Sequence, residues 1–303
     1  MNQILAVCGA TASGKSALAH RLAVDFRAEL LACDSMQIYR GMDIGTAKDD
    51  SGMLQVPLHL TDIADPKQEF SVSDYASLAN ATIADLHAKQ TLPILVGGTG
   101  LYLEAILYEL QLGSRPNDAI RAQLQQRLQQ DGASALHAEL QKIDPQEAQR
   151  VHCNNTRRVI RALEMYYSEG IVKSTHADKS RPMRYDAYVM AIDMPREMLY
   201  ARIDARVAQM FAQGLADEVQ NLLNQGVGWE CQSMQAIGYK EFRAFFEQGA
   251  SLDQVQEEIC RNTRHYAKRQ LSWLRRYPFV QWIPYDQDYN VTKSNIERFL
   301  EKQ

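Results

Sequence analysis

The chain has 303 residues, 46% of them hydrophobic, and a formal net charge of −4, which excludes a wholly basic nucleic-acid binder and is typical of an ordinary soluble protein. No apolar run approaches the roughly 20 residues that a membrane span requires, and the N-terminus leads directly into a short strand without a signal peptide. The five cysteines form no CxxC pair, which favours reduced thiols. We therefore expect a cytoplasmic protein.

The first predicted strand, Ile4–Val7, leads into a phosphate-binding loop. The octapeptide Gly9-Ala10-Thr11-Ala12-Ser13-Gly14-Lys15-Ser16 has the glycine, lysine and serine spacing of a P-loop. In such a loop successive backbone N–H groups point into one concavity, and the helix expected to begin near Ser16 adds its positive end. Lys15 would bind phosphate oxygens and the Ser16 hydroxyl a Mg²⁺ ion. A chance glycine-rich turn would not combine this spacing with a strand and an amphipathic helix, so the loop predicts a bound di- or triphosphate.

Further apolar runs predict the strands of an α/β fold. They lie at Leu30–Cys33, Pro93–Val96 and Tyr188–Ile192, with helical patterns between them, and a last short strand is expected at Phe279–Ile283. This alternation indicates a P-loop-type parallel sheet flanked by helices. Because ligands bind at the carboxyl ends of such strands, the loops at Gly9–Ser16, Asp34–Ser35 and Gly97–Gly100 should converge on one site.

Residues 113–185 follow a different pattern. They are rich in Gln, Ala, Leu and Arg at helical spacing and contain no convincing strand. We interpret them as a helical insertion domain that contacts RNA, within a catalytic core formed by residues 1–112 and 186–303. After the strand near Val189, a helix should begin at Pro195, with Gly214 and Gly226 as breaks.

Two of the converging loops carry candidate catalytic groups. A lone carboxylate such as Asp34 could simply cap the next helix, but its position beside the phosphate loop makes it a candidate general base. The loop containing Thr99 follows a strand after which P-loop hydrolases usually have an acidic residue, and that residue is missing. Its glycines and hydroxyl are suited to holding a leaving group, although a plain strand-to-helix turn remains an alternative.

Two segments are rich in basic residues and contain no acidic one. On a helix, at about 100° per residue, the basic side chains of residues 261–276 share one arc: Arg261, Arg264, Lys268, Arg269, Arg275 and Arg276. The second segment, residues 150–161, contains Arg157, Arg158 and Arg161. A solvated face usually carries both signs of charge, so we interpret these segments as contacts for a nucleic-acid backbone.

Eight segments form an ordered series: GATASGKS, DSMQIYRGMDIGTAK, VPLHLTDI, FSVSDY, PILVGGTGLY, HCNNTRRVIRALE, MQAIGYKE and TRHYAKRQLSW. In this order they resemble the motifs of the bacterial tRNA dimethylallyltransferases, also called tRNA isopentenyltransferases, over nearly the whole chain. The resemblance implies transfer of a dimethylallyl group from its diphosphate to N6 of the adenosine immediately 3′ of the anticodon, with release of pyrophosphate. It implies Mg²⁺ as cofactor, and the anticodon stem-loop of tRNA and dimethylallyl diphosphate as partners. We expect the protein to act as a monomer.

The resemblance also implies roles for individual residues. Asp34 would take the proton from N6, Thr99 would lie beside the reacting centre, and Lys15 would stabilise the leaving diphosphate. Gln37 could read an adenine edge. The diphosphate-binding set is Gly9, Ala10, Thr11, Ala12, Ser13, Gly14, Lys15, Ser16 and Arg206, with Ser16 as the metal ligand. The tRNA-binding set is Asp34, Ser35, Met36, Gln37, Thr99, Arg121, Arg157, Arg158, Val159, Ile160, Arg161, Gln235, Ala236, Ile237, Gly238, Tyr239, Lys240, Arg264, Lys268, Arg269 and Arg275.

Other functions stay open on the residues alone. A P-loop small-molecule kinase would explain Lys15 and Asp34 equally well but not the basic segments. An RNA-binding NTPase would use ATP binding to drive a conformational change, and the missing acidic residue argues against it. Transfer of the same group to a free adenine nucleotide would leave both basic segments without a role.

Overall fold

The computed structural model describes residues 2–48, 55–108, 117–176 and 182–301. The chain divides into two compact units, one formed by Met1–Leu107 with Met183–Gln303 and the other by Tyr108–Pro182. The sequence analysis assigned the insert to residues 113–185, so the unit begins five residues earlier and ends three residues earlier. Each unit is described by itself below.

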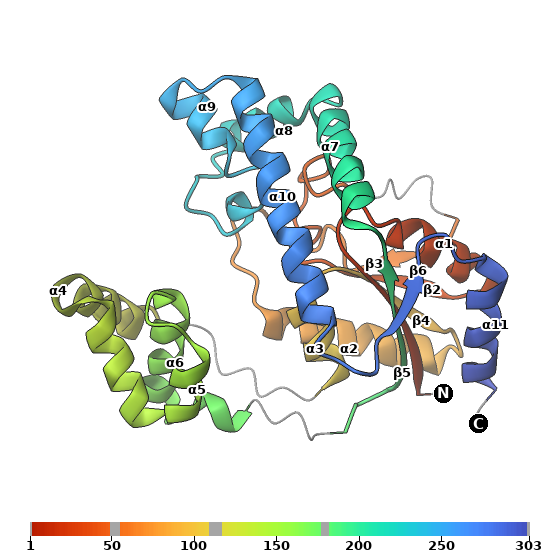
Figure 1. Cartoon of the computed structure of the whole chain (residues 1–303), viewed down its shortest axis with the longest axis horizontal. Coiled ribbons are helices and arrows are strands. Elements are labelled where there is room, and N and C mark those ends of the chain that lie inside the picture. The colour runs from red at the N-terminus through yellow and green to blue at the C-terminus, as the bar shows by residue number, and fades with distance from the viewer. Residues whose placement is uncertain (1, 49–54, 109–116, 177–181, 302–303) are drawn as a thin grey trace. The chain divides into compact units, whose positions relative to one another are not determined.

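The first unit is built on a six-stranded sheet in which every strand pair is parallel (Figure 1). Its order is β3-β2-β4-β1-β5-β6, and the strands are β1 (Gln3–Cys8), β2 (Glu29–Cys33), β3 (Leu58–His59), β4 (Pro93–Gly97), β5 (Asp186–Asp193) and β6 (Gln281–Pro284). The predicted α/β fold with a parallel sheet is confirmed. The sequence analysis missed β3, which is too short to show a hydrophobic period, and placed the start of β6 too early. Residues 277–280 instead form a turn in which Val280 N donates to Tyr277 O at 3.2 Å.

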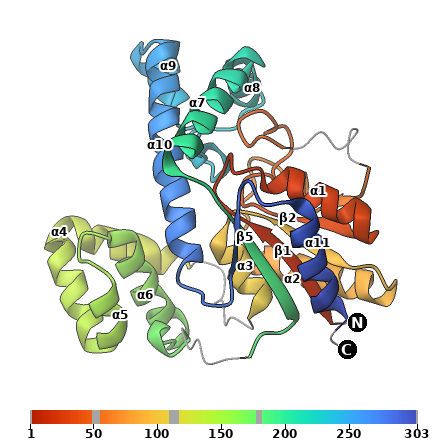
Figure 2. The ribbon, with the colours of Figure 1, turned by 45° about the vertical axis from the view of Figure 1, so that its right-hand side comes forward.

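Helices cover both faces of the sheet, which explains why the residues of β1 and β4 are buried throughout. On one face α1 (Lys15–Phe26) and α11 (Tyr289–Leu300) pack on side chains such as Val7, Ile94 and Met190. Figure 2 shows these two helices on the same side. On the other face lie α2 (Val72–Ala88) and α3 (Gly100–Leu107), where the rings of Tyr75 and Tyr102 stack at 3.8 Å.

Four helices extend this unit beyond the carboxyl edge of the sheet (Figure 1). They are α7 (Arg196–Ala212), α8 (Leu215–Asn224), α9 (Phe242–Gln248) and α10 (Leu252–Leu274). The predicted breaks at Gly214 and Gly226 both have positive φ, 94° and 78°, and bracket α8. The basic helix was predicted from Arg261 onward. It begins nine residues earlier, at a Ser251 capping box, and ends at Leu274, so that Arg275 is its C-cap and Arg276 lies beyond it.

The described part of the second unit, residues 117–176, contains helices and no strand. It consists of α4 (Asp118–Ile143), α5 (Pro145–Arg150), α6 (Thr156–Glu169) and a 3₁₀ turn at Lys173–His176. Gly132, with φ of 80° and ψ of 168°, interrupts α4. Leu124, Leu136, Leu140 and Leu163 form its core. Across the ranges described for both units, every helix is too short or too polar to span a bilayer.

Candidate active site

The phosphate loop follows β1 and has the backbone that its glycines predict. Gly9 has φ of 150°, and a Cβ there would lie 2.8 Å from Ser13 Oγ; Gly14 has φ of 94°. Gly14 is also the N-cap of α1 and provides no side-chain cap, so the first N–H groups of the helix face the loop. Lys15 Nζ reaches back to Ala10 O at 3.5 Å. This donor set, an ammonium and a helix N-terminus, is suited to an anion such as a diphosphate.

Two side chains from distant helices complete the loop. Arg206 on α7 donates from Nη1 to Thr11 Oγ1 at 2.9 Å, which places a guanidinium at the loop as the resemblance implied. Gln270 on α10 accepts from Thr11 N at 2.9 Å and donates to Gly98 O at 3.1 Å. A Cβ on Gly98 would lie 2.0 Å from Gln270 Nε2, so the glycine is required for this contact. The sequence analysis missed Gln270, because a buried Gln in a basic helix carries no motif signal.

Asp34 and Thr99 follow neighbouring strands and are joined through backbone contacts. Asp34 Oδ1 accepts from Met36 N at 2.9 Å, and Thr99 Oγ1 accepts from Ser35 N at 3.1 Å. Residues 35–48, which directly follow Asp34, form no helix, and the next helix among the described residues, α2, begins at Val72 and is capped by Ser71. Asp34 is therefore not a helix cap, and the alternative that was left open for it is wrong. Its carboxylate lies at the carboxyl edge of the sheet, where the three predicted loops converge.

Tyr266, on α10, is a further residue of this group that the sequence analysis did not assign to the site. Burial, with Asp34 nearby, raises the pKa of its hydroxyl above the ordinary value for tyrosine. The Arg269 guanidinium lies 5.6 Å from the centre of its ring. Tyr266 thus stays protonated at neutral pH and presents a hydroxyl and an aromatic face beside the carboxylate.

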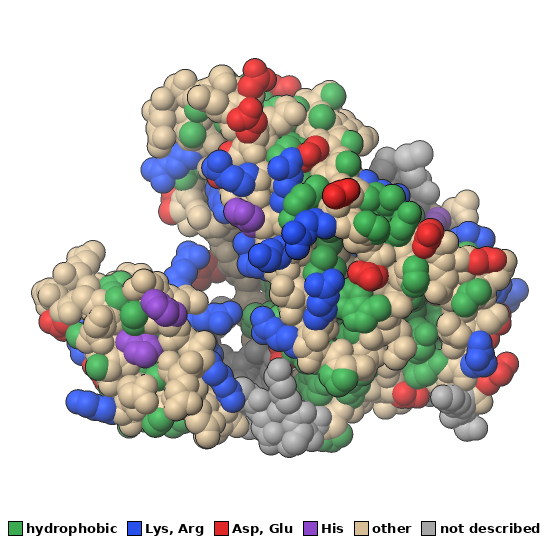
Figure 3. Space-filling view, in the orientation of Figure 1, with side chains coloured by type: hydrophobic (Ala, Val, Ile, Leu, Met, Phe, Trp, Pro, Cys, Tyr) green, Lys and Arg blue, Asp and Glu red, His purple; other side chains and the backbone are tan. Residues whose placement is uncertain are grey.

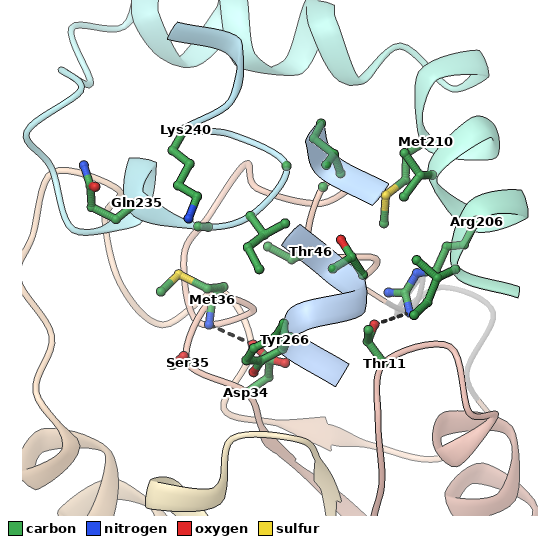
Figure 4. A pocket seen from close by; sticks show the side chains of 18 of the residues that line it. Thr11, Asp34, Ser35, Met36, Thr46, Arg206, Met210, Gln235, Lys240 and Tyr266 are labelled. Carbon is green, nitrogen blue, oxygen red and sulfur yellow. Dashed lines mark hydrogen bonds between the residues drawn. The ribbon is translucent and has the colours of Figure 1, made fainter. Parts of the chain in front are cut away.

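These elements enclose a cavity of about 270 Å³ that adjoins a hollow of about 60 Å³ over the phosphate loop (Figure 4). The hollow is lined by Lys15, Ser16 and Gln37, and the cavity by Ser35, Met36, Lys240 and Arg269. Both are lined by a shared set, Thr11, Asp34, Thr46, Arg206 and Tyr266. The two spaces are therefore neighbours, with the candidate base between them.

The motif at residues 235–240 lies partly on the cavity and partly in the core. Gln235, Ala236, Ile237, Gly238 and Lys240 line the cavity, although Ala236 is only 5% exposed. Tyr239 is fully buried and donates its hydroxyl proton to Glu218 at 2.6 Å. Its predicted contact with RNA is wrong for this structure, since its side chain has no exposed surface.

Gln37 differs from the prediction in a similar way. Its Nε2 donates to the carbonyls of Thr46 and Ala47 at 3.2 and 3.3 Å. A bidentate reading of an adenine edge needs both the donor and the acceptor of the amide, and here the donor is already engaged by the backbone. The predicted bidentate contact is therefore not available in this arrangement, and only Oε1 could contact a base, as an acceptor.

The basic face of α10 carries less net positive charge than its own sequence suggests, because acids pair with two of its arginines. Arg264 forms a two-pronged ion pair with Asp204 on α7, at 3.1 and 2.5 Å, and Arg261 pairs with Glu258. Lys268, Arg269 and Arg275 are exposed. Figure 3 shows Lys and Arg side chains gathered over this part of the first unit. The acids that neutralise part of the stripe come from outside the acid-free segment.

The second basic segment runs from Arg150, the last residue of α5, into the start of α6 at Thr156. Arg157 and Arg158 are exposed, whereas Arg161 and Arg121 both pair with the buried carboxylate of Glu164, each at 3.2 Å. Val159 and Ile160 are 1% and 8% exposed and belong to the core of the second unit. Their predicted RNA contacts are wrong for this structure, because they lie on the apolar side of an amphipathic helix.

Two cysteines near the site can be set aside as nucleophiles. Burial raises the pKa of the Cys8 thiol to about 12, despite the nearby Lys15 ammonium, and raises that of Cys33 as well. Both stay protonated at neutral pH. All five cysteines of the chain are free thiols.

The fold and this site define an α/β enzyme in which a loop with the P-loop spacing and a candidate general base line adjoining spaces at one edge of the sheet. A family model described as IPP transferase matches residues 37–277, and the chain belongs to this family. It is 44% identical to the tRNA dimethylallyltransferase 1 of Trichlorobacter lovleyi, in an alignment that covers 98% of this chain and 99% of the relative.

Solved structures give the same result. The chain is similar to the full-length tRNA isopentenylpyrophosphate transferase of Bacillus halodurans, with 40% identity, a TM-score of 0.73, and coverage of 99% of this chain and 96% of that one. It is also similar to a eukaryotic dimethylallyltransferase acting on tRNA, with 26% identity and a TM-score of 0.85 over 100% of this chain and 80% of that one.

Proposed function

We propose that this chain transfers a dimethylallyl group from dimethylallyl diphosphate to N6 of the adenosine immediately 3′ of the anticodon of a tRNA, with release of pyrophosphate. The observation that carries the proposal is the position of Asp34, which lines both the hollow over the phosphate loop and the adjoining cavity. A donor diphosphate in the first space and an acceptor base in the second would meet at this carboxylate. Family membership and the names of the relatives support the same reaction.

The donor would be held by the phosphate loop. Lys15, the N-terminal N–H groups of α1 and Arg206 offer positive charge to the diphosphate, and their interaction strengthens as the C–O bond breaks and charge grows on the leaving group. A Mg²⁺ ion fits this arrangement, because the Ser16 hydroxyl lines the hollow and is an oxygen ligand. Such an ion would help to neutralise the charge of the leaving diphosphate. No cluster of three metal-ligating side chains occurs in the part of the chain that the structure describes, so substrate oxygens would complete its shell.

The acceptor amine needs activation, because the exocyclic nitrogen of adenine is a poor nucleophile. Asp34 would take the N6 proton while nitrogen attacks the allylic carbon and diphosphate leaves from the same carbon. Thr99 holds the loop that carries Asp34 through the Ser35 N–H, and Tyr266 lines both spaces beside Asp34. The base must leave the anticodon-loop stack to reach the carboxylate, as in other enzymes that act on a nucleobase.

RNA binding would depend on the exposed cations. The exposed cations of the predicted set are Lys240, Lys268, Arg269 and Arg275 in the first unit and Arg157 and Arg158 in the second. Arg264, Arg161 and Arg121 are already paired with acids and would contribute less. We further expect the protein to act as a monomer in the cytoplasm.

Mass spectrometry of nucleosides tests this function. Unmodified tRNA is incubated with the protein, Mg²⁺ and dimethylallyl diphosphate, and with Asp34→Asn as a matched control. We expect a prenylated adenosine together with an equal amount of pyrophosphate, and no tRNA-stimulated ATP hydrolysis. ATP turnover with no change in tRNA mass would instead support an RNA-binding NTPase, and a phosphorylated small molecule would support a kinase.

A further inference from the structure

The carboxylate of Glu218 has no part in the proposed reaction, and its hydrogen bonds hold one wall of the active-site cavity in place. Glu218, in α8, accepts hydrogen bonds from three successive backbone N–H groups: Oε2 from Asp43 at 2.9 Å and Ile44 at 2.8 Å, and Oε1 from Gly45 at 3.1 Å. The Tyr239 hydroxyl adds a fourth bond to Oε1 at 2.6 Å. Hydrogen bonds to an ionised acceptor are stronger than neutral ones, so this is a firm attachment between α8 and a loop 173 to 175 residues away.

Tyr239 and Gly45 are fitted to each other at this attachment. A Cβ on Gly45 would lie 2.5 to 2.8 Å from atoms of the Tyr239 ring and hydroxyl, so the close approach requires a glycine. Burial and the neighbouring Glu218 raise the pKa of Tyr239 well above its ordinary value. The hydroxyl therefore keeps its proton at neutral pH and remains a donor to the carboxylate.

The fastened segment continues directly into the active site. Gly45 and Thr46 line the cavity, and the carbonyls of Thr46 and Ala47 accept from Gln37 Nε2. These two bonds tie the segment to the loop that carries Asp34. Ala47 has φ of 46°, in the left-handed region that a residue with a side chain rarely adopts, so this turn needs support from outside itself.

We propose that Glu218, together with Tyr239, is a positioning residue for the acceptor base. It holds residues 43–47 so that the wall formed by Gly45 and Thr46 is set for an adenine in the cavity, and it touches neither substrate. The inference rests on the proposed function for the identity of the acceptor. The attachment itself is a property of the fold and can be measured separately.

Three variants test this role. Glu218→Gln keeps the shape but turns an NH₂ group toward N–H and O–H donors, Tyr239→Phe removes one donor, and Asp217→Asn removes an exposed carboxylate one residue earlier on α8 as the control. With saturating dimethylallyl diphosphate, we expect Glu218→Gln to raise the KM for an anticodon stem-loop about tenfold and Tyr239→Phe about threefold. The KM for dimethylallyl diphosphate should stay within about twofold in all three, since the phosphate loop is untouched.

A rise in the KM for the stem-loop without a rise in the KM for dimethylallyl diphosphate distinguishes a positioning role from a merely structural one. A variant that only destabilises the fold lowers the amount of active enzyme and hence kcat, with both KM values unchanged, and that result in Glu218→Gln would overturn the proposal. Hydrogen exchange gives a readout that needs no activity. The amides of residues 43–45 should exchange faster in Glu218→Gln than in Asp217→Asn, and equal exchange would also overturn it. If the wild-type protein makes no prenylated adenosine, the proposed function fails, while the exchange result still decides whether the attachment exists.

Discussion

The phosphate loop and the basic segments were both predicted from short stretches of sequence. The structure agrees more closely with the prediction for the loop than with the positive charge predicted for the basic segments. In the loop, the glycine backbone, lysine and helix N-terminus lie within eight consecutive residues, so the sequence contains the main phosphate-binding groups, and the distant Arg206 and Gln270 add contacts to Thr11. In the basic segments, the positive charge left for a ligand depends on acidic residues outside them. Asp204 pairs with Arg264, and Glu164 pairs with Arg121 and Arg161. A motif whose partners are local can be read directly, whereas a run of charge gives only an upper limit to the charge that a ligand meets.

The largest expected effect concerns Asp34, the carboxylate beside the phosphate loop. Asp34→Asn keeps the size of the side chain and removes its basicity, so it should lower the single-turnover rate by about 10²–10⁴ while both substrates remain bound. Rapid-quench measurement of prenylated tRNA checks this. A rate near that of the wild-type protein would mean that Asp34 only orients its loop through the Met36 N–H.

Lys15→Ala tests whether the phosphate cradle is separable from the RNA-binding residues. We expect dimethylallyl diphosphate affinity to fall by about 10²-fold or more, since a charge-assisted contact in a concave site is removed. Affinity for tRNA should stay nearly unchanged. Calorimetric titration of each ligand measures both, and an equal loss of the two would show that the sites are not independent.

The same difference between local and distant partners decides which features of the molecule could be predicted from the sequence. The parallel sheet was predicted from its buried apolar strands, and the converging loops from the rule that ligands bind at strand ends. Gln270 and Glu218 were missed, because a polar residue in a helix shows its partner only when the chain is folded. Tyr239, Val159 and Ile160 were predicted to contact RNA because they belong to motifs. In the structure Val159 and Ile160 lie on the apolar side of α6, and Tyr239 is fully buried.

Salt dependence tests the distant half of the comparison. Neutralising Lys268, Arg269 and Arg275 to Gln should flatten the slope of log affinity against log salt for an anticodon stem-loop by up to about two to three units, one for each released counterion. Arg264→Gln should change the slope by clearly less than one unit, because Asp204 already neutralises it. Equal slope changes for Arg264 and Lys268 would show that the ion pair opens when RNA binds.

The buried carboxylate of the second unit should matter for stability. Glu164 is 0% exposed and holds two arginines and the Asn117 N–H, so Glu164→Gln should lower the free energy of unfolding of this unit by about 1–3 kcal/mol. Asp131→Asn is the control: its pairing with Arg127 at 3.8 Å is exposed, and a change within about 0.5 kcal/mol is expected. Urea denaturation of both variants gives the difference, and equal stability would mean that the arginines are solvated without Glu164.

The smallest expected effect concerns Glu139 of the second unit, which pairs with Arg127. Arg127 hydrogen-bonds with Glu139, and this contact, with Tyr167 contributing, holds the pKa of Glu139 below its ordinary value. A carboxylate with a lowered folded-state pKa stabilises the fold above its ordinary pKa, and that contribution is lost as the pH falls through the lowered value. The stability difference between the wild-type protein and Glu139→Gln should therefore be constant at neutral pH and shrink below about pH 4.5. Thermal denaturation between pH 3 and 7 measures it, and a difference that persists at the lowest pH would show that Glu139 contributes through packing and not through its charge.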